Sequence, residues 1–226
     1  MRIDLPEPEA FKRMISEMTK QEITVKITGI GLDSREIHPG DLFVALSGEN
    51  VNGHDFLGQA KENGAVAAVV SNNRDNINLP QIEIEEPEIL VGMLAAKWRT
   101  NFSLPVIGIT GSNGKTTTKD LLMHIFSASH TVHGTRGNYN TYLGLPLTLL
   151  ELTSHHTFSI LEMGANRTGD IEYLSNLSLP LYGLITNIAR AHLQSFGSIE
   201  EIARTKGELF ASLPEEGTAF INMDDN

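Results

Sequence analysis

Residues 106–118, which read VIGITGSNGKTTT, constrain the fold more than any other part of this 226-residue chain. A short apolar strand leads into a glycine-punctuated turn, and a helix follows that opens with Lys115 and Thr116. The N–H groups of such a turn and the positive end of the helix dipole suit a phosphate. Lys115 would reach the β- and γ-phosphates, and the Thr116 hydroxyl would hold Mg²⁺. The segment predicts a nucleoside triphosphate site; the alternative is an ordinary glycine and asparagine turn.

Strands and helices alternate through residues 101–226, which predicts a parallel sheet with helices on both faces. Ligands of such sheets bind beyond the C-terminal ends of the strands. We expect one face of the helix that follows the turn to pack inward through Leu121, Leu122, Ile125 and Phe126. The expected strands are 106–110, 131–133, 157–163, 182–187 and 218–222, and the expected helices are 115–128, 145–152, 170–177 and 198–213.

Residues 1–100 are expected to form a separate, smaller α/β domain. Its expected helices are 6–20, 56–63 and 87–100, and its expected strands are 23–27, 41–46 and 65–70. The predicted fold class is therefore α/β: a small N-terminal domain followed by a partial P-loop ATPase domain with a mostly parallel sheet. The sequence stops just after a strand, so we expect it to be cut within the second domain.

Composition narrows the possible partners. The net charge of −11 argues against a nucleic-acid partner, because phosphate backbones are bound by clusters of Lys and Arg. Zero cysteines exclude disulfides and thiolate metal sites, which fits the cytoplasm. No apolar run reaches the ~20 residues that a membrane span needs. We also expect a monomer.

Several polar residues follow predicted strands and are site candidates. Glu162 ends an apolar strand, where a carboxylate can hold Mg²⁺, or can merely face solvent. His192 follows another strand, although by itself it is better explained as a loop histidine that caps the next helix. Lys206 lies on a predicted helix and by itself suggests only a solvated lysine. Asn138 and Asn140 lie in a glycine-bounded loop and could bind substrate or a metal-bound water, or simply form a turn.

Taken in order, these motifs resemble those of the Mur ligases of peptidoglycan synthesis. The phosphate loop has five residues between Gly108 and Gly114, one more than the common P-loop, and this is the form that the family shares. The resemblance spans nearly the whole chain. Its other carriers are Asp33-Ser34-Arg35, GDLFVAL at 40–46, GHDF at 53–56, GNYN at 137–140, EMGAN at 162–166, RAHL at 190–193 and Lys206-Gly207-Glu208.

The resemblance implies ATP-driven amide synthesis. In the family, a tripeptide carboxylate attacks the γ-phosphate to give an acyl phosphate and ADP, and an amine then displaces phosphate. Loop 137–146 and residues 162–166 favour the member that adds D-alanyl-D-alanine to UDP-N-acetylmuramoyl-tripeptide. The resemblance also implies that residues 1–100 bind the UDP-sugar, that residues 101–226 form an incomplete ATP-binding domain, and that a C-terminal domain for the incoming dipeptide is absent.

The resemblance also assigns roles to individual residues. Thr116 and Glu162 match ligands of the ATP-linked Mg²⁺, and His192 matches the ligand of a second ion. Lys206 matches a carbamylated lysine, which turns a cation into an anion beside that second metal. The catalytic candidates are Lys115, His192 and Lys206; the ATP-binding candidates are Gly111, Ser112, Asn113, Gly114, Lys115, Thr116 and Thr117; the substrate-binding candidates are Ser34, Arg35, Asn138 and Asn140.

Two alternatives stay open. One is a related Mur ligase that adds meso-diaminopimelate or lysine, because its N-terminal motifs are similar. The other is a non-catalytic module that binds a nucleotide or a UDP-sugar. A P-loop GTPase is disfavoured, since no Asn-Lys-x-Asp motif is present. Because a third domain would align the amine, we expect these 226 residues alone to make no peptide bond.

Overall fold

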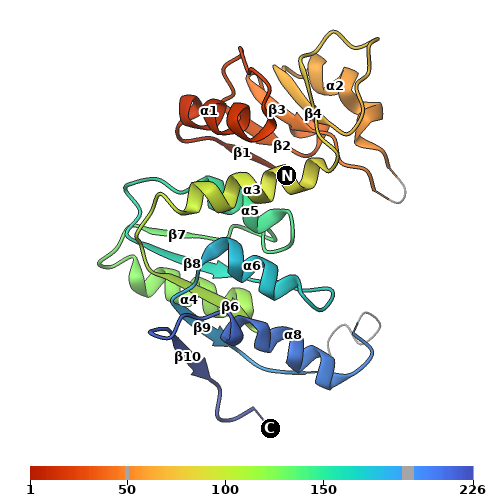
Figure 1. The fold of residues 1–226 in the computed structure, drawn as a ribbon. Coiled ribbons are helices and arrows are strands. Elements are labelled where there is room, and N and C mark those ends of the chain that lie inside the picture. Colours follow the sequence, from red (N-terminus) through yellow and green to blue (C-terminus); the bar gives the residue numbers. More distant parts are fainter. Residues whose placement is uncertain (49–50, 190–195, 226) are drawn as a thin grey trace. The chain divides into compact units, whose positions relative to one another are not determined.

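The computed structural model describes residues 1–48, 51–189 and 196–225. The chain divides into two compact units, Met1–Ala95 and Ala96–Asn226. The division falls inside helix α3 (Pro87–Arg99), close to the boundary expected at residue 100. Each unit contains its own five-stranded sheet. Figure 1 shows the two units with their sheets. The predicted α/β fold class is confirmed.

The first unit is built on a sheet in the order β1-β2-β3-β4-β5. Only β1 runs antiparallel to its neighbour, and the other three pairs are parallel. Leu57 and Ala60 of α2 pack with Phe43 and Ala68 in one buried cluster, so this helix covers β3 and β4. The elements are β1 (Arg2–Asp4), α1 (Pro8–Thr19), β2 (Gly29–Gly31), η1 (Ser34–Glu36), β3 (Asp41–Val44), η2 (Gly53–Phe56), α2 (Leu57–Glu62), β4 (Ala67–Val70) and β5 (Gln81–Glu83).

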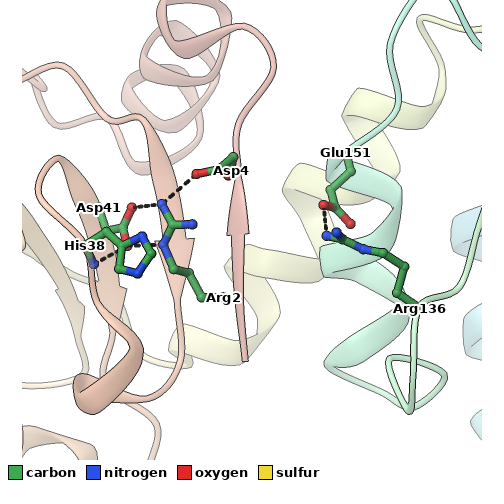
Figure 2. A network of polar contacts seen from close by, with 6 residues as sticks. All are labelled: Arg2, Asp4, His38, Asp41, Arg136 and Glu151. Carbon is green, nitrogen blue, oxygen red and sulfur yellow. Dashed lines mark hydrogen bonds and ion pairs between the residues drawn. The ribbon is translucent and has the colours of Figure 1, made fainter.

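A buried ion pair ties the first strand to the third (Figure 2). The Arg2 guanidinium donates to both carboxylate oxygens of Asp41, from Nε at 2.7 Å and from Nη2 at 3.0 Å. The Asp41 side chain has no exposed surface and also accepts the His38 backbone N–H at 2.8 Å. Arg2 extends to the exposed Asp4 as well. Figure 2 also draws the ion pair between Arg136 and Glu151, which belongs to the second unit.

We expect Arg2→Met to destabilise the first unit by about 2 kcal/mol. Removing one partner of a wholly buried pair costs about 3–5 kcal/mol; here Arg2 is partly exposed, and Asp41 keeps the His38 bond. Urea unfolding at pH 7 measures the change. The matched control is Arg204→Met, which breaks an exposed pair with Glu201 and should change stability by less than about 0.5 kcal/mol. Equal effects of the two variants would contradict a structural role for the Arg2–Asp41 pair.

The second unit has an all-parallel sheet in the order β10-β9-β6-β8-β7. The alternation of strands and helices predicted that the sheet is parallel. None of the helices in the described residues is both long and apolar enough to cross a membrane. The elements are β6 (Val106–Thr110), α4 (Lys115–Phe126), β7 (Val132–Gly134), α5 (Gly144–Leu150), β8 (Phe158–Glu162), α6 (Asp170–Ser178), β9 (Tyr182–Ile185), α8 (Ile199–Ala211) and β10 (Thr218–Ile221).

Helices α4 and α8 cover opposite faces of this sheet. Leu122 and Phe126 of α4 pack against Ile107 and Ile109, which point to one side of β6. Gly108 lies between them and points to the other side, where an added Cβ would stand 2.9 Å from Leu209 of α8. Gly108 is therefore a strand residue that admits a close helix, and the glycine-rich loop begins only after β6. This explains the extra residue in its spacing.

Two local expectations were wrong. Residues 23–27 form no strand; Ile23 and Ile27 are buried in irregular backbone, and the ladder with β1 and β3 is made by β2 instead. On α4, Leu121 and Ile125 are 59% and 62% exposed, although we expected them to face inward. The helix instead turns Lys119 toward the interior, a polar residue that an apolar pattern does not select.

Candidate nucleotide-binding site

The glycine-rich loop occupies residues 111–114, between the C-terminal end of β6 and the start of α4. Gly111 has φ +147°, and an added Cβ would lie 1.9 Å from the Thr186 hydroxyl oxygen. Gly114 has φ +79° and is the N-cap residue of α4. Side chains are disfavoured at both positions. The loop conformation thus depends on the two glycines that the sequence places there.

Part of the loop backbone is held by the segment that follows β9. The N–H of Ser112 donates to the Asn187 carbonyl oxygen, and the N–H of Asn113 donates to the Asn187 side-chain oxygen, both at 2.9 Å. Thr186 donates its hydroxyl to the Asn113 carbonyl oxygen at 2.6 Å. Two N–H groups of the loop are therefore engaged within the protein. Among the described residues no side chain caps the first turn of α4, so its N–H groups are donors that an anion could use.

Lys115 opens α4 and folds back over the loop. Its ammonium group donates to the Gly111 carbonyl oxygen at 2.8 Å, and its side chain is half-buried. Thr117 is exposed on the same first turn. The helix N-terminus therefore combines a cation with the positive end of the dipole. This arrangement suits a polyphosphate that enters over the first turn.

Glu162 ends β8 at the same edge of the sheet and is 2% exposed. Its Oε2 accepts the Thr116 hydroxyl at 2.9 Å, and its Oε1 accepts the Asn140 side-chain N–H at 2.8 Å. Its backbone N–H donates to the Thr135 hydroxyl at 2.9 Å. The fold thus brings together Thr116, Asn140 and Glu162, which lie on three different segments.

These residues fit a magnesium ion. Carboxylate and hydroxyl oxygens are the donor atoms that Mg²⁺ prefers. Both side-chain donors to the buried Glu162 carboxylate are neutral, and among the described residues no cationic side chain forms an ion pair with it. The described residues contain no group of three or more His, Asp or Glu side chains that could hold a metal ion. A magnesium ion at Thr116 and Glu162 would therefore take its other ligands from phosphate and water.

The asparagine loop is braced from two sides. The Gly164 N–H donates to the Asn140 carbonyl oxygen at 2.7 Å. Tyr142 stacks on Tyr173 of α6, with ring centroids 4.3 Å apart and planes inclined by 17°. Asn140 is therefore held toward Glu162, whereas Asn138 is exposed and makes no hydrogen bond to Glu162 among the described residues.

Lys206 lies on α8 and is only 6% exposed. Burial, and secondarily the charge of Lys115, lowers the pKa of Lys206 to about 8. The low exposure excludes the solvated surface lysine that the local sequence suggested. The pKa is lowered because desolvation favours the neutral amine. Two residues on, Glu208 accepts the N–H groups of Gly169 and Glu172, which ties α8 to the start of α6. His192 lies outside the described residues.

A second candidate site lies in the first unit. A cavity of about 470 Å³ is lined in part by Ser34, Arg35 and Phe56. The Ser34 hydroxyl donates to Gln59 at 2.6 Å and is buried. Arg35 is exposed and pairs with Asp33 at 2.6 Å; the hydrogen bond from Arg35 lowers the pKa of Asp33 to about 2. An exposed guanidinium at the rim of a cavity can bind an anion.

Three residues that were not candidates from the sequence position the glycine-rich loop and Glu162: Thr186, Asn187 and Thr135. Thr186 and Asn187 directly follow β9, so the same strand-end rule that selected Glu162 would have found them. Thr135 follows the short strand β7 in the same way. Their hydrogen bonds, however, are to backbone groups far away in the sequence, which no local pattern reveals.

Fold and site together define a P-loop type of nucleotide-binding α/β protein. A family model described as "Mur ligase middle domain" matches residues 109–226, and one described as "Mur ligase family, catalytic domain" matches residues 26–98. The chain belongs to the Mur ligase family, as the sequence motifs indicated.

Individual relatives carry more specific names. The chain is 41% identical, over 206 residues, to the UDP-N-acetylmuramoyl-tripeptide–D-alanyl-D-alanine ligase of Escherichia coli. The aligned residues make up 91% of this chain and 45% of the relative. A crystal structure of MurF from Acinetobacter baumannii superposes with a TM-score of 0.88 at 35% identity, covering 95% of this chain and 49% of that one. MurF from Thermotoga maritima, in complex with ADP, superposes with a TM-score of 0.76 at 37% identity, covering 84% and 44%. The chain spans about half the length of the relatives it matches.

Proposed function

We propose that these residues are the UDP-sugar-binding and ATP-binding parts of a ligase that joins D-alanyl-D-alanine to UDP-N-acetylmuramoyl-tripeptide in peptidoglycan precursor synthesis. The observation that carries the proposal is the buried Glu162 carboxylate, held by Thr116 at the first turn of α4. The names of the E. coli, A. baumannii and T. maritima relatives support the choice of reaction. In this proposal the reaction takes place in the cytoplasm, where ATP is available.

Residues 101–226 bind ATP in this proposal. Gly111 and Gly114 shape the loop, and Ser112 and Asn113 anchor it to Asn187. The first-turn N–H groups of α4, from Lys115 to Thr117, receive the β- and γ-phosphates. The Lys115 ammonium exchanges its bond with the Gly111 carbonyl for one with phosphate oxygen. Phosphoryl transfer depends mainly on such alignment and charge neutralisation.

Thr116 and Glu162 would hold the ATP-linked Mg²⁺, with Asn140 fixing the carboxylate. His192 and a carbamylated Lys206 would hold a second ion. Bound Mg²⁺ neutralises charge on the phosphates. A buried lysine whose neutral amine is favoured can take up CO₂, and the resulting carbamate is an anion in place of a cation. The low exposure and lowered pKa of Lys206 support this assignment.

The chemistry has two balanced steps. An oxygen of the tripeptide carboxylate attacks the γ-phosphorus, the bond to the β-phosphate oxygen breaks, and ADP leaves. The dipeptide amine then attacks the acyl carbon, phosphate departs with the bonding electrons, and the amine loses a proton. Residues 1–100 hold the UDP-sugar, and Ser34 and Arg35 bind its diphosphate. In the second unit, Asn138 and Asn140 face the carboxylate that reacts.

Calorimetry on the 226-residue chain tests both binding assignments. We expect ADP to bind in the presence of Mg²⁺ and UDP to bind independently of it. Glu162→Gln should abolish the magnesium dependence of ADP binding, whereas the exposed control Glu215→Gln should not. Magnesium-independent ADP binding by the unmodified chain would contradict the site.

The choice among Mur ligases requires the full-length ligase that contains these residues. A panel of amine acceptors should give phosphate release with D-alanyl-D-alanine, and none with meso-diaminopimelate or lysine. Release with one of the latter would replace the proposal by the related ligase. Nucleotide binding without release for any acceptor would favour a non-catalytic module.

A further inference from the structure

His54 is a buried histidine beside the cavity of the first unit, and it has no part in the function proposed above. It belongs to η2, whose Gly53 and Phe56 line that cavity. The side chain is 6% exposed and points away from solvent into a set of hydrogen bonds. Both ring nitrogens are engaged, which restricts the protonation state that the local structure can accept.

The partners of His54 determine its tautomer. Nε2 lies 3.0 Å from the Ser71 backbone N–H, which can only donate, so Nε2 must carry a lone pair. Nδ1 lies 2.8 Å from the Asn52 side-chain oxygen, which accepts, so Nδ1 carries the proton. The same Asn52 oxygen caps η2 by accepting the His54 backbone N–H at 3.0 Å. The neutral ring therefore connects the start of η2 to the end of β4.

We propose that His54 is a positioning residue for the uridine diphosphate cavity: its neutral, Nδ1-protonated ring holds η2, and with it the wall formed by Gly53 and Phe56, in the shape that binds the nucleotide. This inference rests on the proposed UDP-binding role of the cavity. The same end of the wall is also held by the Gly53 N–H, which donates to the Leu46 carbonyl oxygen at 2.7 Å.

A dependence on pH follows from this geometry. When Nε2 takes up a proton it can no longer accept the Ser71 backbone N–H, so the backbone link to β4 is lost, and only a contact with the Ser71 hydroxyl, 3.2 Å from Nε2, can remain. Burial lowers the pKa of His54 below 6.5; among the described residues the charge of Arg74 also lowers it, and that of Asp55 raises it. Because the neutral ring makes the link, the wall is held above the pKa and released as the pH falls through it.

Calorimetric titration with uridine diphosphate between pH 7.5 and 5.5 tests the proposal. We expect the unmodified chain to lose affinity as the pH falls over this range, and His54→Gln to lose less. The glutamine side-chain oxygen can replace Nε2 as an acceptor and does not titrate. Ionisation of the ligand itself affects both proteins equally and cancels in the comparison. His155→Gln, at an exposed histidine, is the control and should follow the unmodified chain.

His54→Leu keeps the apolar volume and removes the acceptor, so we expect about tenfold weaker binding at every pH. Unchanged affinity in this variant, or an equal loss with pH in His54→Gln, would overturn the proposal. If the leucine variant does not fold, the glutamine comparison still decides.

A readout without ligand separates this inference from the proposed function. Long-range ¹H–¹⁵N spectra at pH 7.5 should show His54 protonated on Nδ1 alone, and a proton on Nε2 would refute the link to Ser71. Absence of any uridine diphosphate binding, with the ring found in the expected state, would instead refute the assignment of the cavity.

Discussion

We expect replacement of Lys115 by alanine to lower kcat/KM of the proposed full-length ligase by about 10³-fold, the scale of a lost electrostatic clamp on a developing charge. The lysine stands at the first turn of α4, where no side chain caps the helix, and its ammonium reaches across the loop to Gly111. It therefore supplies a mobile cation at the point where the phosphates would arrive. The value of kcat/KM for ATP is measured from phosphate release at saturating dipeptide and varied ATP concentration.

The control for Lys115 is Lys26→Ala, which removes an exposed lysine of the first unit and should leave turnover within about twofold. Lys115→Met adds information because it keeps the aliphatic stem and loses only the charge. If methionine restored activity lost in the alanine variant, packing rather than charge would explain the loss. Turnover by Lys115→Ala close to that of the unmodified enzyme would eliminate the assignment.

Lys206→Ala is expected to lower the activity of the proposed full-length ligase by at least about 10²-fold. The argument rests on burial: with a pKa of about 8, about a quarter of the amine is neutral at pH 7.5, against about one part in 10³ at the ordinary 10.5. Only the neutral amine attacks CO₂. Carbamylation should therefore rise with pH through 8 and fall below it.

Labelling with ¹³CO₂ in the presence of nucleotide and Mg²⁺ should give one carbamate signal that Lys206→Ala lacks. Added short-chain carboxylates should restore part of the activity of that variant, because they replace the missing anion. Arg204→Ala, at an exposed position of the same helix, should retain both the signal and the activity. Full activity of Lys206→Ala, or an unlabelled Lys206 in the active enzyme, would refute the carbamate.

The order of elements in the second unit and the glycine-rich loop were predictable because their signals are local. An apolar strand, two glycines with positive φ and a helix that opens with Lys115 form one continuous segment, so neighbouring residues specify the shape. Glu162 was predictable for a related reason. The end of an apolar strand in an alternating pattern falls on the ligand edge of a parallel sheet wherever the strand sits in the sheet order.

Other features escaped prediction because they depend on which surfaces meet. Leu121 and Leu122 are both apolar, and only the packing of α4 on β6 and β8 decides that Leu122 turns inward with Lys119. Residues 23–27 have the composition of a strand, but β2 is the strand that pairs with both β1 and β3. Strand pairing is a competition between distant segments, which local propensity does not resolve.

The sequence by itself determined the family, the α/β class and the residue types at the phosphate loop, since each depends on contiguous residues or their spacing. Only the tertiary structure decided the state of the buried groups. Burial makes Lys206 a candidate for a neutral amine, and Ser71 selects the tautomer of His54. The physical reason is that desolvation and hydrogen-bond partners, which set protonation, come from segments that only folding brings together.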